Sequence, residues 1–195
     1  MDEENNLIKQ RIEESISAKK DFISETENIR KAAHAIVKAL KNKGKILVFG
    51  NGGSAADSQH IAGELIGKFM LKRKALPAIA LTTDTSVITS WSNDNSEGFE
   101  TVFERQIEAL ANPGDVLIGI TTSGDSENVI RAFKKGHEKQ TINISLTGKD
   151  GGKIKQLSDI NINSISKETP SIQECHIVAY HIICELVEKE MANSD

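Results

Sequence analysis

Short apolar segments alternate with helical patterns along most of this chain, and no other feature constrains its fold as strongly. Each segment is too short for a helix, and glycine, proline or aspartate often lies at its end. We interpret these segments as strands: KILVFG (45–50), AIALT (78–82), VLIGI (116–120), TINISL (141–146) and DININ (159–163). Strands that alternate with helices predict an α/β three-layer fold, with a mostly parallel five-stranded sheet covered by helices on both faces.

Helical patterns also precede and follow this alternation. Residues 4–43 contain two stretches with apolar residues at helical spacing, which predict an N-terminal pair of helices. Residues 170–191 form a longer pattern, and Pro170 suits the first turn of a closing helix. A chain of 195 residues is long enough for one domain with a substantial core. We therefore expect a single domain over 1–195, with N-terminal helices in 1–43 and an α/β core in 44–195.

Composition and charge exclude several classes of function. The net charge of −4 and the pI of about 5.8 do not indicate nucleic-acid binding. No apolar run approaches the ~18 residues of a membrane span, and the start MDEENNLIKQ lacks an apolar signal region. Cys175 and Cys184 lie ~13 Å apart along one predicted helix, too far for a disulfide. We expect a cytoplasmic protein with reduced cysteines and neither nucleic-acid nor membrane partners.

Two loops rich in glycine and hydroxyl residues each follow a predicted strand and open a helix. They are VFGNGGS (48–54) and GITTSGDS (119–126). Helix N-termini present free N–H groups to anions, and the carboxyl ends of parallel strands are the usual place for ligands. For either loop alone, helix capping and tight turns are the simpler explanation. Two such loops at two strand ends instead favour a cradle for a monophosphate.

The pattern after the first loop predicts a helix over about 54–70, and a histidine and a glutamate lie on it. His60 and Glu64 are four residues apart and share a helix face, with Asp57 near that face. Taken alone, such a pair usually forms a local hydrogen bond. Beside a phosphate loop, an imidazole and a carboxylate are equally suited to acid–base chemistry or metal binding.

The closing helix supplies three further candidate side chains. His176 and His181 point about 140° apart around the helix, so at most one of them belongs to the site and a buried structural role suits the other. Gln173 and His181 are ~12 Å apart along the axis. If both bind one ion, we expect either an irregular helix or a contribution from a second subunit.

Several segments, taken in order, resemble one known family. These segments are FGNGGSAADSQHIAGELIGKF, AIALTTDTSVITSWSND, GDVLIGITTSGDSENVIRAF, SLTGKDGGKI and TPSIQECHIVAYHIICELVEKEM. Over residues 43–191 the chain resembles the phosphoheptose isomerases of the sugar isomerase (SIS) fold.

The resemblance implies an activity and its chemical groups. The family converts sedoheptulose 7-phosphate to D-glycero-D-manno-heptose 7-phosphate through an enediol, the first step of ADP- or GDP-heptose synthesis for lipopolysaccharide or surface glycans. By the match, Glu64 and His181 form the proton-transfer pair. The matched zinc ligands, for one ion per subunit, are His60, Glu64, Gln173 and His181.

The resemblance also assigns substrate contacts and an assembly. Its phosphate contacts fall on Ser54, Thr121, Ser123 and Ser126, and its other substrate contacts fall on Asn51, Gly52, Gly53, Glu64, Asn93, Asp94, Thr122 and Gln173. The family forms homotetramers with sites at subunit interfaces. This chain departs from the family in a longer NDNSEGF segment, in Lys68 where arginine is common, and in Thr121 where serine is common.

Two other functions use the same fold. One is a non-catalytic protein that binds the replication initiator, and the other is a sugar-phosphate sensor. The related initiator-binding protein lacks the acid–base pair, so the presence of both Glu64 and His181 here favours the isomerase.

Overall fold

A computed structural model describes residues 2–192; residue 1 and residues 193–195, at the ends of the predicted domain, lie outside the described part. Its core is a sheet of five strands in the order β2-β1-β3-β4-β5, and all four neighbouring pairs are parallel. The sheet thus agrees with the predicted class. The strands are β1 (Ile46–Gly50), β2 (Ala78–Ala80), β3 (Val116–Thr121), β4 (Ile142–Gly148) and β5 (Ile160–Ser164).

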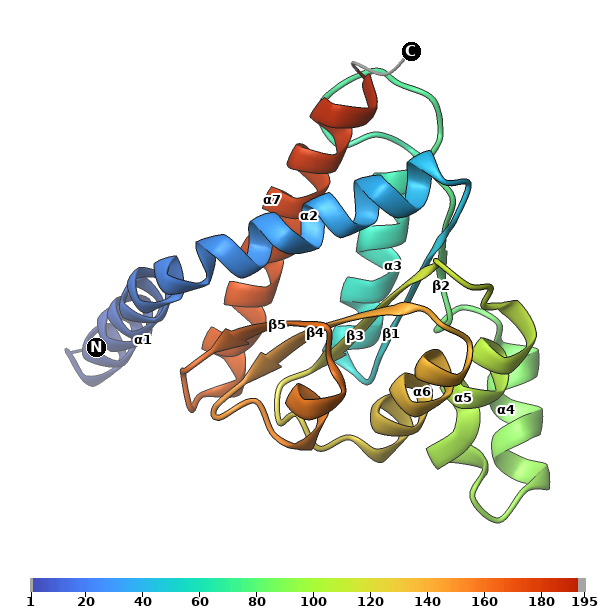
Figure 1. Cartoon of the computed structure of the whole chain (residues 1–195). Helices are drawn as coiled ribbons and strands as arrows, with labels where there is room; N and C mark the ends of the chain where they lie inside the picture. The colour runs from blue at the N-terminus through green and yellow to red at the C-terminus, as the bar shows by residue number, and fades with distance from the viewer. Residues whose placement is uncertain (1, 193–195) are drawn as a thin grey trace.

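Helices cover both faces of this sheet, which gives three layers (Figure 1). Alternate residues of β1 point to opposite faces: Ile46 and Val48 enter one hydrophobic cluster, and Leu47 and Phe49 enter the other. The first cluster lies under α2 (Thr26–Lys41), α3 (Gly53–Ile66) and α7 (Thr169–Ala192). The second lies under α4 (Thr85–Asp94), α5 (Gly98–Leu110) and α6 (Glu127–Glu138). The 3-10 segment η2 (Lys153–Leu157) precedes β5.

The first helix differs from the amphipathic helix that the sequence predicts. Its apolar residues face solvent, although α1 (Asp2–Asp21) forms as expected. Phe22 lies instead in the short 3-10 segment η1 (Phe22–Glu25), where its side chain is buried. In Figure 1, α1 extends away from the sheet. Its polar contacts run to α7, where Ser15 and Lys19 both bond to Glu174.

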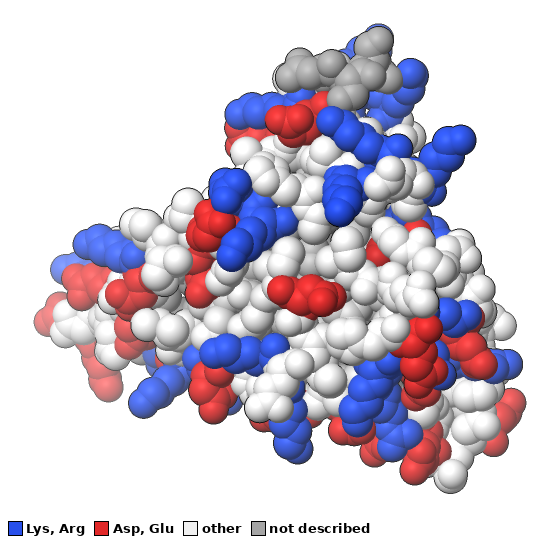
Figure 2. All heavy atoms as spheres, viewed as in Figure 1, with Lys and Arg blue, Asp and Glu red and all other residues white. Residues whose placement is uncertain are grey.

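Surface charge agrees with the low net charge. On the face drawn in Figure 2, basic and acidic side chains are interspersed. None of the described helices is long and apolar enough to cross a membrane. Cys175 and Cys184 are free and buried, as predicted.

The helix after β1 ends earlier than its pattern predicts, and a buried carboxylate organises the next segment of the chain. The predicted helix reaches residue 70, whereas α3 ends at Ile66. Glu188 of α7, 1% exposed, accepts hydrogen bonds from the backbone N–H groups of Phe69, Met70 and Leu71 at 3.0, 2.6 and 2.6 Å. Burial by itself raises the pKa of Glu188, but these donors and Arg73 outweigh it and the net pKa is lowered.

Arg73 completes this junction from within a run of basic residues. Its side chain is 2% exposed, although such runs usually form solvated faces. Its guanidinium donates to the carbonyls of Glu64 and Leu65, both at 2.8 Å, and to that of Lys74 at 2.9 Å. Nε lies 3.4 Å from Glu188 Oε1, an ion pair without hydrogen-bond geometry. Arg73 therefore satisfies the last carbonyls of α3 and anchors that helix end to α7.

We expect Glu188→Ala to lower the free energy of unfolding by roughly 3–5 kcal/mol, because it leaves the buried Arg73 charge and three N–H groups without their acceptor. Chemical denaturation at pH 7 measures this loss. The matched control is Glu185→Ala on the same helix, which removes a more exposed pair with Lys189 and should cost less than about 0.5 kcal/mol.

The stabilisation also has a defined pH dependence. Because the folded pKa of Glu188 is lowered, its contribution is present above the unfolded pKa of about 4.3 and is lost as pH falls through the folded value. Glu188→Ala should therefore lose less stability than the wild type on acidification below that pH. Equal costs for the Glu188 and Glu185 variants at pH 7 would contradict this account.

Candidate active site

The two predicted phosphate loops lie next to each other. Strands β1 and β3 pair in register, with Gly50 opposite Ile120, so the loops leave the sheet at adjacent carboxyl ends. In the second loop the hydroxyl of Thr121 lies 2.9 Å from that of Ser126 and 3.4 Å from that of Ser123. The structure thus gathers three predicted phosphate-binding hydroxyls beside the N-terminus of α6.

The first loop requires close backbone approach. A Cβ on Gly50 would lie 2.7 Å from the carbonyl oxygen of Ile120 and 2.8 Å from Cβ of Ser54, so only glycine fits there. Ser54 itself is buried. Asn51 and Asn128 exchange two amide hydrogen bonds of 2.9 Å, which tie this loop to α6. The Asn51 side chain is therefore part of the scaffold that holds the two loops together.

Helices α3 and α7 bring the predicted acid–base residues together. One donor or acceptor atom from each of His60, Glu64 and His181 lies within 4.8 Å of the others. His60 Nε2 is 3.0 Å from Glu64 Oε1, and the rings of His60 and His181 are 5.1 Å apart at a steep angle. Phe69 stacks on His181 with ring centroids 5.5 Å apart. The site is about half open, since the His60 side chain is 47% exposed and that of Glu64 is 19% exposed.

The donor set suits a metal ion. Two imidazoles and a carboxylate are ligands that zinc accepts, and three protein ligands with an open fourth position are typical of catalytic zinc sites. The three side chains come from two helices that pack against each other, which holds their ligand atoms within 4.8 Å of one another.

Gln173 lies elsewhere along α7. Its Nε2 approaches Gly53, where a Cβ would lie only 2.4 Å from it. Both helices are regular, so Gln173 lies ~12 Å along α7 from His181, and Gly53 lies ~10 Å along α3 from His60. Of the four predicted zinc ligands, the structure brings three together. Within one chain it leaves Gln173 beside the first phosphate loop.

The two histidines of α7 separate as predicted. His176 is fully buried and its Nε2 lies 2.9 Å from the carbonyl oxygen of Thr147. Burial lowers the pKa of His176 to about 4, so the ring is neutral near pH 7. His176 is thus the structural histidine, and His181 is the one at the site.

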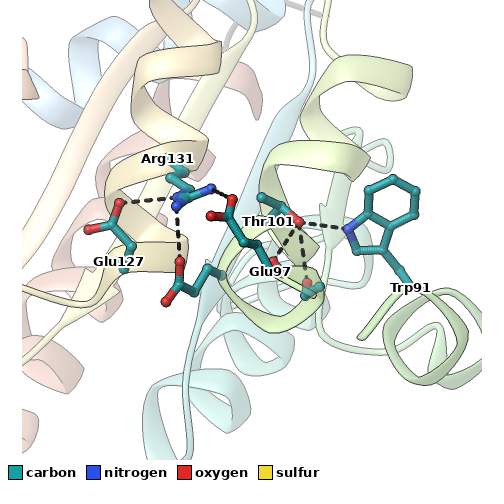
Figure 3. A network of polar contacts seen from close by, with 7 residues as sticks. Trp91, Glu97, Thr101, Glu127 and Arg131 are labelled. Atoms are coloured by element: carbon teal, nitrogen blue, oxygen red, sulfur yellow. Dashed lines mark hydrogen bonds and ion pairs between the residues drawn. The ribbon is translucent and has the colours of Figure 1, made fainter. Parts of the chain in front are cut away.

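The longer NDNSEGF segment (93–99) runs from the end of α4 into the start of α5. Asn93 and Asp94 are exposed at the end of α4, where the Asn93 side chain donates to Asp94 at 2.9 Å. Across the turn, Arg131 of α6 pairs with Glu97 at 2.6 Å and with two further carboxylates, those of Glu100 and Glu127 (Figure 3). The first of these bonds, to Glu97, contributes most to raising the pKa of Arg131. The turn is therefore fixed to α6 rather than to the phosphate loops.

Trp91 helps to hold the same turn from its other side. Its Nε1 donates to the hydroxyl of Thr101 at 2.8 Å (Figure 3), and the guanidinium of Arg105 lies 4.8 Å from its ring centre. Among the other predicted positions, Thr122 is half-buried in the second loop, Gly52 is exposed with φ of 56°, and Lys68 is exposed.

Several residues that support the site were not predicted from the sequence. Asn128 pairs with Asn51, Arg73 caps α3, and Tyr180 lies between Asp57 and His60. The sequence gives some indication of Tyr180, because this residue directly precedes His181. No pattern in the sequence indicates that Asn128 faces Asn51, since the pairing depends on the register of β1 and β3.

Comparisons with known proteins agree with this geometry. The family model described as the SIS domain matches residues 12–148. The phosphoheptose isomerase of Aquifex aeolicus is 54% identical over 93% of this chain and 95% of its own length. The solved phosphoheptose isomerase of Francisella tularensis has a TM-score of 0.91 at 38% identity, over 95% of this chain and 98% of that one. That of Neisseria gonorrhoeae has a TM-score of 0.89 at 43% identity, with the same coverage of both chains.

The two glycines of the first loop should respond differently to alanine. We expect Gly50→Ala to cost roughly 1–3 kcal/mol of stability, because backbone atoms block its Cβ. Gly53→Ala meets only the flexible end of Gln173 and should unfold within about 1 kcal/mol of the wild type, since alanine also favours the helix. Gly53→Ala should instead raise KM for a sugar phosphate, because its Cβ would displace the side chain of Gln173. Denaturation and steady-state kinetics on both variants check this, and a KM unchanged by Gly53→Ala would argue against Gln173 at the substrate.

Proposed function

The chain belongs to the phosphoheptose isomerases of the SIS-domain family, and on this premise we propose that it converts sedoheptulose 7-phosphate to D-glycero-D-manno-heptose 7-phosphate. It is a sugar-phosphate isomerase, which sets aside the initiator-binding and sensor alternatives. The reaction would open the synthesis of nucleotide-activated heptose for surface glycans in the cytoplasm.

One arrangement supports this proposal most directly. The triad of His60, Glu64 and His181, formed by α3 and α7, lies further along α3 than the hydroxyl-lined phosphate cradle at the start of that helix. Ser54 and His60 on α3 are ~9 Å apart along the axis, which leaves room for a sugar chain between them. The phosphate would bind Ser54, Thr121, Ser123 and Ser126, with its charge facing the helix N-termini. Asn51, Gly52, Gly53, Thr122, Gln173, Asn93 and Asp94 remain proposed substrate contacts.

The chemistry moves a proton between neighbouring carbons through an enediol. We assign the removal of the proton to the carboxylate of Glu64 and the donation of a proton to the sugar oxygen to the imidazole of His181, because a carboxylate oxygen and a ring nitrogen of the two lie within 4.8 Å of each other. Phe69 keeps the His181 ring oriented. His60, Glu64 and His181 would hold zinc, which when bound polarises oxygen atoms of the substrate.

Turnover of sedoheptulose 7-phosphate tests the proposal. We expect Glu64→Gln and His181→Gln to lower kcat by roughly 10²–10⁴-fold, the range for loss of a general acid or base. The matched control is His34→Gln, which removes an exposed histidine of α2 and should keep wild-type kcat. Strong activity in Glu64→Gln or His181→Gln would remove that residue from the mechanism.

The same assay tests the metal. Treatment of the wild type with a chelator should abolish most turnover, and added zinc should restore it, with about one ion bound per chain by elemental analysis. Full activity in a metal-free preparation would reject zinc as a cofactor. It would leave the proton-transfer roles to be decided by the two variants.

The first helix supports self-association with sites at subunit interfaces, and we propose a homotetramer. Four apolar side chains of α1 are 48–57% exposed, and they recur at helical spacing on a helix with no buried residue: Leu7, Ile8, Ile12 and Ile16. A contiguous exposed apolar stripe of this kind usually marks a protein interface. A second subunit would also supply the group that completes the donor set, which Gln173 of the same chain does not reach.

We expect the double variant Ile8→Glu, Ile12→Glu to dissociate the assembly, because it puts charge into the apolar stripe. Light scattering coupled to size-exclusion chromatography gives the mass, and the turnover assay should show lower kcat if subunits share sites. The control Ser17→Glu adds charge at an exposed position on the opposite face of the same helix, about 180° around the axis from Ile8, and should keep the wild-type mass. A monomeric wild type would contradict the proposal.

A further inference from the structure

The hydroxyl of Tyr180 lies between a buried carboxyl group and the site histidine. It is 3.3 Å from Oδ1 of Asp57 and 3.0 Å from Nδ1 of His60. Tyr180 is 2% exposed and Asp57 is 9% exposed, so both lie between α3 and α7 beneath the open face of the site. These two residues belong to neither the phosphate cradle nor the triad.

The donors and acceptors fix the direction of these bonds. A phenol carries one proton near neutral pH, because its ordinary pKa is about 10. A carboxylate only accepts hydrogen bonds, so Tyr180 donates to Asp57. Its oxygen must then accept the proton of His60 Nδ1. With Nδ1 protonated, the free lone pair of the His60 ring is on Nε2, and Nε2 is the nitrogen that can bind a metal ion.

His60 Nε2 points at the rest of the triad. It lies 3.0 Å from Oε1 of Glu64. An unprotonated ring nitrogen and a carboxylate oxygen are both acceptors, so they repel at this distance unless a proton or a cation lies between them. The contact of Tyr180 with Nδ1 thus leaves Nε2, on the opposite side of the ring, free to bind a positive charge next to Glu64.

A contribution to stability does not by itself explain the contact between Tyr180 and Asp57. Asp57 Oδ2 is buried and has no hydrogen-bond partner, which costs free energy. Glu188 of α7, by contrast, has three N–H donors from the segment that follows α3. Carboxyl groups that do not touch the metal but orient a metal-binding histidine through hydrogen bonds are typical of metal sites. Asp57 has such a position, since it contacts Tyr180 and Tyr180 contacts His60.

We propose that Tyr180 and Asp57 are positioning residues that hold His60 with Nδ1 protonated and Nε2 directed at the metal. The inference rests on the metal site of the proposed function and extends it to two residues that do not touch the ion. Tyr180 acts on the ring directly, and Asp57 acts through Tyr180.

Nitrogen-15 NMR of histidine in the full-length, metal-free protein tests the orientation without any activity. We expect the wild type to show His60 protonated at Nδ1, and Tyr180→Phe, which keeps the ring and removes only the hydroxyl, to shift His60 towards Nε2 protonation. Nδ1 protonation that persists in Tyr180→Phe would overturn the proposal, as would an unprotonated Nδ1 in the wild type.

Zinc affinity, measured against a competing chelator, tests the consequence. Tyr180→Phe should raise the zinc dissociation constant by roughly 10–100-fold, the usual effect of losing an outer-shell partner. Asp57→Asn keeps an acceptor oxygen and should raise it less. The control Ser145→Ala removes a buried hydroxyl of β4 and should leave it unchanged. Equal zinc affinity in Tyr180→Phe and the wild type would overturn the proposal.

The outcomes separate this inference from the proposed function. A wild type that binds no zinc rejects the metal site, and the NMR comparison then decides alone whether Tyr180 orients His60. A wild type that binds zinc but does not turn over sedoheptulose 7-phosphate rejects the substrate and leaves this inference standing. Thermal unfolding of each variant confirms that the comparison is made between folded proteins.

Discussion

The parallel packing of α3 against α7 is the constraint on which the site depends. Contacts occur in step along the two helices: Gln173 meets Gly53, Tyr180 meets Asp57, His181 meets His60, and Glu188 meets the chain just after α3. A helix advances 1.5 Å per residue, so this alignment fixes which side chains meet and which do not. It explains both why the triad forms and why Gln173 is kept from it.

Two buried carboxyl groups on this helix pair have opposite energetics. Glu188 has three N–H donors and a nearby guanidinium, and its pKa is lowered despite burial. Asp57 has one weak donor and an oxygen without a partner, and its pKa is raised. The first arrangement stabilises the packing of α3 on α7. The second is costly, and we relate that cost to the orientation of a site residue.

Local sequence patterns predicted much of the arrangement of the candidate site. The loops after β1 and β3 were predicted as anion sites because each couples glycine and hydroxyl residues to a helix start, and the structure places them together. The spacing of His60 and Glu64 predicted a shared face. Arg73 was not predicted, because a basic residue in a charged run ordinarily faces solvent. Its burial depends on Glu188, more than a hundred residues later.

The sequence by itself determined the alternation of strands and helices, the two loops, and the separation of His176 from His181, because periodicity and chirality act over a few residues. Only the tertiary structure decided that Tyr180 reaches His60, that Asn51 pairs with Asn128, and that Gln173 stays with the phosphate loop. The apolar face of α1 shows the same division. The helix itself follows from local pattern, whereas only the tertiary structure shows that its apolar side chains stay exposed and do not enter the core.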